Sequence, residues 1–228
     1  MDLWAVVPVK ELDRAKERLA TLLPTHVRQA LMLAMLEDVL AALAATPGLG
    51  GIAVVTVDPA ACRLAATYGA RVIELGARDG HTGAVTAAAR LLGEEGCTGM
   101  LTLPGDIPLV TPTEIAQLLE AHRPAPSFTI APSRDEHGSN AILCSPPDAV
   151  PLRFGEDSFF PHLRAAEERG IRPTVLRVPG IALDVDTPDD LAAFARLPSS
   201  TRARALLAAN DMLHIGQQAA AAIGSPWR

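Results

Sequence analysis

The stretch Leu101-Thr-Leu-Pro-Gly-Asp-Ile-Pro-Leu-Val110 is the clearest indication of the fold class of this chain. It starts as an apolar run typical of a buried strand, and Pro104 and Gly105 bring that run to an end. One carboxylate, Asp106, then stands at the carboxyl end of the strand, where open α/β sheets bind their ligands. Asp106 is therefore a candidate metal ligand. On this stretch alone, a solvated turn aspartate is an equally good interpretation.

Short apolar runs of the same kind recur along the chain and alternate with helical patterns. Strands are expected at residues 3–7, 52–57, 71–75, 99–103, 127–131, 141–144 and 174–178, and helices at residues 24–45, 58–68, 84–92, 112–122, 159–169 and from 188 onward. This alternation predicts a three-layer α/β fold with a mainly parallel sheet. The runs at 127–131 and 141–144 are expected to pair as a hairpin.

Composition narrows the class of protein. The chain has 228 residues, of which 49% are hydrophobic and only 4% aromatic, so Leu, Ala and Val must fill the core. The net charge of −6 and the absence of Lys/Arg runs argue against a nucleic-acid partner. The longest apolar run, near residues 31–36, is too short to span a membrane. Three scattered cysteines and no signal-peptide pattern favour a cytoplasmic location.

The sequence predicts that the chain divides into a main domain and a C-terminal extension. Residues 1–197 are expected to form the main domain, and Leu197-Pro-Ser-Ser200 is expected to be a linker. Residues 198–228 are then a C-terminal helical extension with a frayed tail, in which the Ala-rich stretch 201–223 reads as one helix. A second copy of the chain is a candidate partner for that helix, which would make a homodimer.

Cations follow the first predicted strand. Lys10, Lys16 and Arg18 come soon after Pro8, and phosphate groups bind at this place in α/β sheets. Lysine offers a point charge and arginine a fork that matches phosphate oxygens. The alternative is an ordinary charged surface helix, because Glu17 stands between two of the cations.

A glycine-bearing loop is expected at residues 76–86, after the strand that ends near Glu74. Gly80 and Gly83 would allow a ligand close to the backbone, and Thr82 offers a hydroxyl. The loop is neither a Walker A motif nor a dinucleotide fingerprint. His81 has no His or Cys partner nearby, so a solvated or hydrogen-bonded loop residue is favoured over a metal ligand.

Two later segments could bind an anion. Gly138-Ser139-Asn140 ends a polar loop and could supply backbone and side-chain donors, although a plain turn explains it equally well. Gly155 permits a sharp turn, and Ser158 is expected to cap the helix at 159–169. A capped helix start binds anions readily. The alternative is a capped helix with a purely structural role.

An acidic cluster stands near residue 185. Asp184 and Asp186 alternate with apolar Leu183 and Val185, so the two carboxylates share one face of an extended segment. Thr187 is expected to cap the helix that follows, just as Thr111, with Glu114, is expected to form a capping box at the helix that runs to residue 122. Mg²⁺ is typically held by one or two carboxylates together with substrate phosphates. Asp184 and Asp186 are therefore candidate magnesium ligands that would act with Asp106.

Four motifs carry a resemblance to a known family. They are Val7-Pro8-Val9-Lys10 with Ala15-Lys16-Glu17-Arg18-Leu19, Pro104-Gly105-Asp106-Ile107-Pro108, Phe154-Gly155-Glu156-Asp157-Ser158-Phe159, and Leu183-Asp184-Val185-Asp186-Thr187-Pro188-Asp189-Asp190-Leu191. Together they resemble the guanylyltransferase family of deazaflavin coenzyme F-420 biosynthesis, within the molybdenum-cofactor-type nucleotidyltransferases. The similarity covers residues 1–197. It implies a Rossmann-like fold of the nucleotide-diphospho-sugar-transferase type.

The resemblance also implies an activity and roles for individual residues. The enzyme would transfer GMP from GTP to the phosphate of 2-phospho-L-lactate, phosphoenolpyruvate or 3-phospho-D-glycerate and release pyrophosphate. Lys10, Lys16 and Asp106 would be catalytic through positioning and charge neutralisation. The family resemblance implies that the nucleotide contacts Pro8, Lys10, Lys16, Arg18, Glu74, Gly80, Thr82 and Gly83. It implies that the phospho-acid contacts Asn140, Gly155 and Ser158. It also implies that Mg²⁺ is bound by Asp106 with Asp184, Asp186 or both.

One departure and two rival functions accompany the resemblance. Members of the family often carry Gly-Leu-Asn where this chain has Gly80-His81-Thr82-Gly83. This difference favours 3-phosphoglycerate or phosphoenolpyruvate as the acceptor. A nucleotidyltransferase for a pterin or a sugar phosphate is the first rival function. A catalytically silent nucleotide-binding module is the second.

Overall fold

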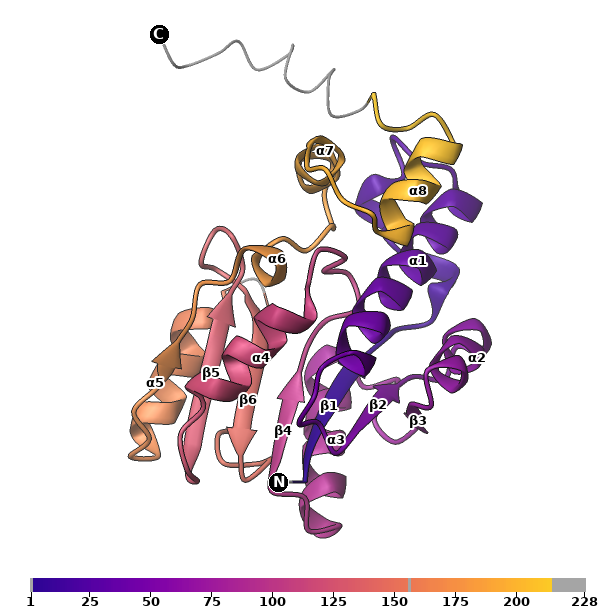
Figure 1. Ribbon diagram of the computed structural model, residues 1–228. Coiled ribbons are helices and arrows are strands. Elements are labelled where there is room, and N and C mark those ends of the chain that lie inside the picture. The colour runs from indigo at the N-terminus through magenta and orange to yellow at the C-terminus, as the bar shows by residue number, and fades with distance from the viewer. Residues whose placement is uncertain (1, 156, 215–228) are drawn as a thin grey trace, which may run out of the picture.

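The structure is a computed structural model and describes residues 2–155 and 157–214. Within these ranges seven strands form one sheet in the order β3-β2-β1-β4-β6-β5-β7 (Figure 1). The strands are β1 (Leu3–Pro8), β2 (Gly51–Val55), β3 (Arg71–Ile73), β4 (Gly99–Thr102), β5 (Ser127–Pro132), β6 (Ser139–Ser145) and β7 (Thr174–Val175). In this described part, β6 alone runs against its neighbours β4 and β5. The predicted mainly parallel sheet and the predicted β5–β6 hairpin are therefore confirmed.

Helices cover both faces of this sheet and complete the three layers. They are α1 (Thr25–Ala44), α2 (Pro59–Thr67), α3 (Gly80–Glu94), α4 (Pro112–Ala121), α5 (Phe159–Glu168), α6 (Pro179–Ala182), α7 (Pro188–Arg196) and α8 (Arg202–Ala209), with short 3₁₀ turns η1 (Leu12–Arg14) and η2 (Glu17–Leu19). Alternate residues of β1 point to opposite faces: Val7 packs in the cluster with α1, α2, α4 and α6, whereas Val6 packs with α3. Helix α5 packs against β5 and β6 on Phe128 and Ile142. No described helix is long and apolar enough to cross a membrane.

Local capping signals position several helices as the sequence predicts. Thr111 and Glu114 form a capping box at α4, and Thr187 and Asp190 form one at α7. Asp58 accepts hydrogen bonds from the first amides of α2. Because each cap satisfies backbone donors that the helix itself leaves unpaired, each fixes where the preceding loop ends.

Three predicted boundaries are wrong. Helix α3 begins at Gly80 rather than at residue 84, so most of the predicted glycine loop forms the first turns of a helix. Strand β7 covers only Thr174–Val175 instead of residues 174–178, and the short helix α6 begins soon after it at Pro179. Helix α8 ends at Ala209, where the chain turns through Asp211 at a φ of 55°. The predicted helix at 201–223 is therefore too long, and its last residues lie outside the described part.

Helix α8 is attached to α1. The buried carboxylate of Asp38 accepts hydrogen bonds from the amides of Arg202 (2.8 Å) and Ala203 (3.0 Å). Leu207 and Ala203 pack in the same apolar cluster as Leu31 of α1. The first turn of α8 thus takes part of its N-terminal capping from a side chain more than 160 residues earlier.

The reversed direction of β6 matters for the site. Thr102 near the end of β4 pairs with Ile142 of β6 in antiparallel register. The start of β6, at Ser139 and Asn140, therefore lies at the same edge of the sheet as the carboxyl ends of β1 and β4. This edge collects the loops that carry the candidate site residues.

Candidate active site

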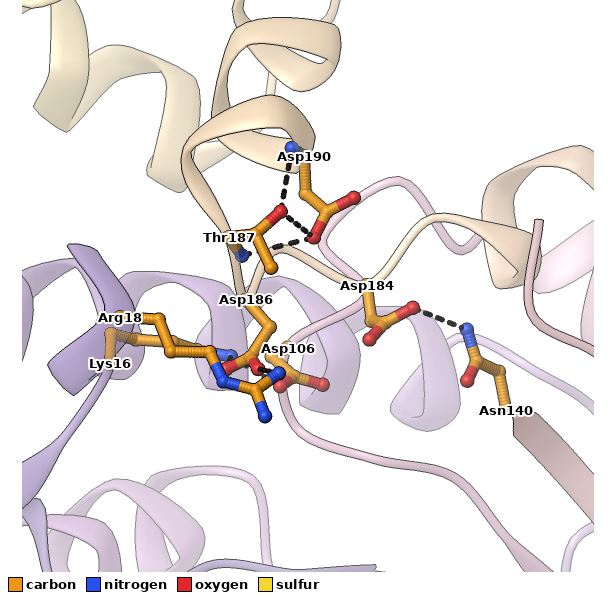
Figure 2. Close-up of polar contacts among 8 residues, drawn as sticks. All are labelled: Lys16, Arg18, Asp106, Asn140, Asp184, Asp186, Thr187 and Asp190. Atoms are coloured by element: carbon orange, nitrogen blue, oxygen red, sulfur yellow. Dashed lines mark hydrogen bonds and ion pairs between the residues drawn. The ribbon is translucent and has the colours of Figure 1, made fainter. Parts of the chain in front are cut away.

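The two acidic segments that the sequence singled out are joined through the backbone. The carbonyl oxygen of Asp106 accepts a hydrogen bond from the amide of Val185 at 2.9 Å. Val185 is fully buried and Leu183 is nearly so, whereas Asp184 and Asp186 remain partly exposed on the other side of the segment. Figure 2 shows Asp106, Asp184 and Asp186 gathered in one place. The predicted alternation along this segment is confirmed.

Two of the predicted cations contact these carboxylates. The Lys16 ammonium hydrogen-bonds to Asp106 and lies 3.4 Å from Oδ1 of Asp186, and Arg18 reaches Oδ2 of Asp186 at 3.1 Å (Figure 2). The Lys16 side chain is only 4% exposed, although the alternative interpretation had placed it on a solvated helix. Its backbone takes a left-handed conformation (φ 52°) as it starts η2, which aims the side chain inward.

The charge state of Lys16 follows from its neighbours. Burial by itself lowers the pKa of this ammonium group, but the carboxylates of Asp106, Asp186 and Asp184 outweigh burial and raise the pKa above its ordinary value. Lys16 therefore stays protonated at neutral pH. Burial, followed by the charge of Asp106, raises the pKa of Asp184, while a hydrogen bond from Asn140 at 3.0 Å opposes that rise.

The carboxylates fit a divalent cation with oxygen ligands. Within the part of the chain that the structure describes, the buried Oδ1 of Asp106 has no hydrogen-bond partner, so a lone pair is left for a further ligand. Asp184 and Asp186 stand on the segment bonded to the Asp106 backbone. Among the described residues, no group of three or more His, Cys, Asp or Glu side chains is arranged to hold a metal by itself. Because Mg²⁺ normally keeps waters and substrate phosphates as ligands, one or two carboxylates suffice.

Three adjoining cavities surround these residues. The first, of about 440 Å³, is lined by Pro8, Lys10, Lys16, Arg18, Asp106 and Asp186 among others. The second, of about 510 Å³, is lined among others by Gly80, Thr82, Asp106, Asn140, Gly155 and Ser158. The third, of about 340 Å³, includes Arg18, Asn140, Gly155, Asp184 and Asp186. Asp186 borders all three, and Asp106 and Lys10 border the first two. The basic first loop and the candidate anion-binding loops thus flank the same carboxylates.

Ser158 reaches the second cavity in a manner the sequence did not predict. It precedes α5, but its side chain makes no capping hydrogen bond there. Its hydroxyl instead donates to Oγ of Ser139 at 3.2 Å. The expected side-chain cap at α5 is wrong, because a residue in the neighbouring strand engages that hydroxyl.

The segment around residue 80 also differs from expectation. His81 lies in α3 rather than in a loop, borders the first two cavities, and packs its ring 4.2 Å from the ring of Phe154. Burial lowers its pKa to about 4. Thr82 accepts a hydrogen bond from the Phe154 amide at 2.9 Å. Gly80 and Thr82 therefore stand at the second cavity as helix residues.

Two candidate nucleotide-binding residues lie apart from this group. Glu74 follows the edge strand β3, is exposed, and is absent from the lining of the three cavities. Gly83 packs within its own helix start, where an added Cβ would lie 2.3 Å from the Cβ of Asp79. The chain needs glycine here for helix entry.

Asp58 is a positioning residue that sequence reasoning missed. Its Oδ1 caps α2, while its Oδ2 accepts from the amide of Leu12 in the first loop at 3.0 Å. Leu12 borders the first cavity. The Asp58-Pro59 pair signals a helix start, but no local pattern could reveal a second bond to a residue 46 positions away.

Comparisons with known proteins agree with this geometry. The family model for "Guanylyl transferase CofC like" matches residues 3–212. A phosphoenolpyruvate guanylyltransferase of Conexibacter woesei is 40% identical over 203 residues, which cover 89% of this chain and 91% of that protein. A 3-phospho-D-glycerate guanylyltransferase of Colwellia psychrerythraea is 38% identical over 197 residues, covering 85% and 91%.

Solved structures of other proteins share the fold. A nucleotide-diphospho-sugar transferase from Desulfovibrio desulfuricans G20 superposes with a TM-score of 0.72 at 22% identity, covering 95% of this chain and 98% of the other. A 4-diphosphocytidyl-2C-methyl-D-erythritol synthase gives 0.59 at 16% identity, covering 90% and 99%. At these identities the likeness concerns the fold alone, and it confirms the predicted fold type.

Proposed function

The chain belongs to the CofC-like guanylyltransferase family, and we propose that it transfers GMP from GTP to the phosphate of a three-carbon phospho-acid. Pyrophosphate is the other product. The acceptor is phosphoenolpyruvate, 3-phospho-D-glycerate or 2-phospho-L-lactate; the names of two relatives support the first two. A place in coenzyme F-420 biosynthesis stays a prediction of the resemblance.

One observation carries the proposal: the first cavity, which contains Lys10, Lys16 and Arg18, and the second cavity, with the candidate anion-binding loops, meet at Asp106, Asp186 and Lys10. A transfer between two phosphorylated molecules needs two anion sites that share a boundary, with cationic charge where the phosphorus atom is transferred. The first cavity offers Lys10, Lys16 and Arg18 to the triphosphate. The second offers Asn140, Gly155 and Ser158 to the phospho-acid.

The reaction needs little proton transfer. An oxygen of the acceptor phosphate, already an anion, attacks the α-phosphorus of GTP as the bond to pyrophosphate breaks. The residues of this chain hold both groups in line and balance their charge. Lys16, which stays protonated, lines the first cavity beside Asp106 and can neutralise phosphate oxygens there.

Mg²⁺ is the proposed cofactor. Asp106 would hold it through its buried Oδ1, together with Asp184, Asp186 or both. When bound, the ion would neutralise the charge that develops on the phosphate oxygens. Lys16 pairs with two of the same carboxylates, those of Asp106 and Asp186.

A substrate panel tests the proposed function. The protein is incubated with Mg²⁺, one of the four nucleoside triphosphates, and one of the three phospho-acids, a sugar phosphate or a pterin, while pyrophosphate release is followed. We expect release with GTP and a phospho-acid. Turnover with CTP and the pterin alone would contradict the proposal, and so would the absence of turnover in every combination.

A further inference from the structure

A chain of buried hydrogen bonds lies behind the second cavity, and none of the roles above accounts for it. Nδ1 of His162 is 2.9 Å from Oγ of Ser139, and Nε2 of His162 accepts from the amide of Arg153 at 2.9 Å. Ser158 donates to the same Ser139 oxygen at 3.2 Å. The chain connects β6, α5 and the segment that leads to Gly155.

The chemistry of the partners determines which atom donates and which accepts in each of these hydrogen bonds. The Arg153 amide can only donate, so Nε2 of His162 must accept and carries no hydrogen. A neutral imidazole then has its proton on Nδ1, which donates to Ser139. Ser139 thus accepts from both His162 and Ser158, which uses both lone pairs of its oxygen.

The hydroxyl proton of Ser139 is therefore left to donate elsewhere. Among the hydrogen bonds of the described residues, that proton has no acceptor. Ser139 borders the second cavity together with Asn140 and Gly155. An oxygen that already accepts two hydrogen bonds has a more polarised O–H group, which favours an anionic acceptor.

The surroundings keep His162 neutral and in place. The residue is only 1% exposed. Burial, followed by the nearby His81, lowers its pKa to about 4. The ring of Phe154 packs against His162 at 5.2 Å and against His81 at 4.2 Å. A protonated His162 would direct an N–H at the Arg153 amide, so the hydrogen-bond chain requires the neutral ring.

We propose that Ser139 is a further acceptor-binding residue, which donates its hydroxyl proton to an anionic oxygen of the phospho-acid, and that His162 is the positioning residue that fixes this direction. The inference rests on the proposed function. It assigns to the acceptor pocket one donor whose orientation is set before the substrate arrives, and such preorganisation reduces the cost of binding.

Kinetics of the Ser139→Ala variant test the inference. Loss of a hydrogen bond to a charged group should raise the KM for the phospho-acid about ten- to a hundred-fold, with the KM for GTP within about two-fold of wild type. Ser139→Thr keeps the hydroxyl and should restore most of the acceptor affinity. The matched control is Ser145→Ala, at the opposite end of the same strand, where Ser145 makes an equivalent 2.9 Å bond to His122. That variant should leave both KM values unchanged.

Two variants of His162 separate positioning from packing. In His162→Asn the amide nitrogen can take the place of Nδ1 and still donate to Ser139. In His162→Gln the amide oxygen can take the place of Nε2 and still accept from Arg153. We expect the Asn variant to have the lower acceptor KM of the two. The reverse order would contradict the positioning role.

The outcomes separate this inference from the proposed function. Wild-type turnover with an unchanged acceptor KM in Ser139→Ala would overturn the inference and leave the function standing. Absence of wild-type turnover would contradict the function. In that case calorimetry of phosphoenolpyruvate binding to wild type and to Ser139→Ala decides. Weaker binding to Ser139→Ala than to wild type supports the inference. Equal binding to the two proteins, or no binding to wild type, overturns it.

Discussion

The carbonyl oxygen of Asp106 accepts a 2.9 Å hydrogen bond from the amide of Val185. This bond connects the loop after β4 with the segment before α7, nearly eighty residues later. It places Asp106 beside Asp184 and Asp186 through main-chain atoms, so the side chains of Asp106 and Asp186 are left to contact Lys16. Val185 is fully buried, which anchors the segment in the core.

Asp106→Asn should keep the fold and lose most of the turnover. The variant weakens a proposed ligand of Mg²⁺, and the loss of one group that stabilises developing negative charge typically costs about a hundred- to a thousand-fold in kcat. Circular dichroism and steady-state pyrophosphate release check both parts. Asp189→Asn, with the same change on an exposed residue of α7, is the control. Near wild-type turnover in Asp106→Asn would contradict the role of this carboxylate.

Lys16→Met should strengthen metal binding and weaken catalysis. In the structure Lys16 pairs with Asp106 and Asp186, so it competes with a metal for the same oxygens. Without GTP, we expect the variant to bind Mn²⁺ several-fold more tightly than wild type, as measured by electron paramagnetic resonance. With GTP, its turnover should fall. Lys10→Met, from the same cavity, gives the comparison. Unchanged or weaker Mn²⁺ binding in Lys16→Met would contradict the competition.

Asp58→Ala should weaken both stability and nucleotide binding. The change removes the cap of α2 and leaves the buried amide of Leu12 without its acceptor. Together these losses should cost about 2–4 kcal/mol of unfolding free energy. The KM for GTP should rise because the first loop loses its attachment. Thr111→Ala, which removes the cap of α4, should cost about 1 kcal/mol and leave that KM unchanged. Equal GTP KM values in the two variants would rule out the loop role.

His122 should make folding stability depend on pH. It bonds to Thr129 and Ser145, and burial lowers its pKa from 6.5 to about 4. Between these values the unfolded chain binds a proton that the folded chain does not, so stability falls as the pH falls from about 6.5 to about 4. The His122 contribution should be about 1–3 kcal/mol after allowance for its partial exposure. Urea unfolding of wild type and His122→Asn across this range checks the prediction; a constant difference between the two would contradict it.

Local signals predicted much of the fold. The Thr111 and Thr187 capping boxes, the strand interrupted at Pro104 and the alternation at 183–186 each involve residues a few positions apart, and the structure confirms them. The start of α3 was missed because Gly80 and Gly83 are poor helix formers, and here tertiary packing overrides propensity.

The sequence predicted that the site residues follow the ends of the strands. It did not predict which of their side chains contact one another. The Ser158 cap was wrong because the hydroxyl bonds to Ser139, and the second bond of Asp58 reaches the first loop. Lys16 could be read as a surface cation until the fold placed it against Asp106. Each of these outcomes depends on a contact distant in sequence, and a single sequence carries no local pattern for such contacts.

The most direct test of the central claim follows the two ends of GTP separately. The protein is given Mg²⁺ and phosphoenolpyruvate, with GTP radiolabelled either at the α-phosphate or at the γ-phosphate, and the products are separated by chromatography. The account predicts that the α-label enters a new guanylylated phospho-acid and that the γ-label leaves as pyrophosphate, with the same partition when 3-phospho-D-glycerate or 2-phospho-L-lactate is the acceptor that the enzyme uses. Recovery of the γ-label as free phosphate, or of the α-label only in GTP or GDP with all three acceptors, would contradict it.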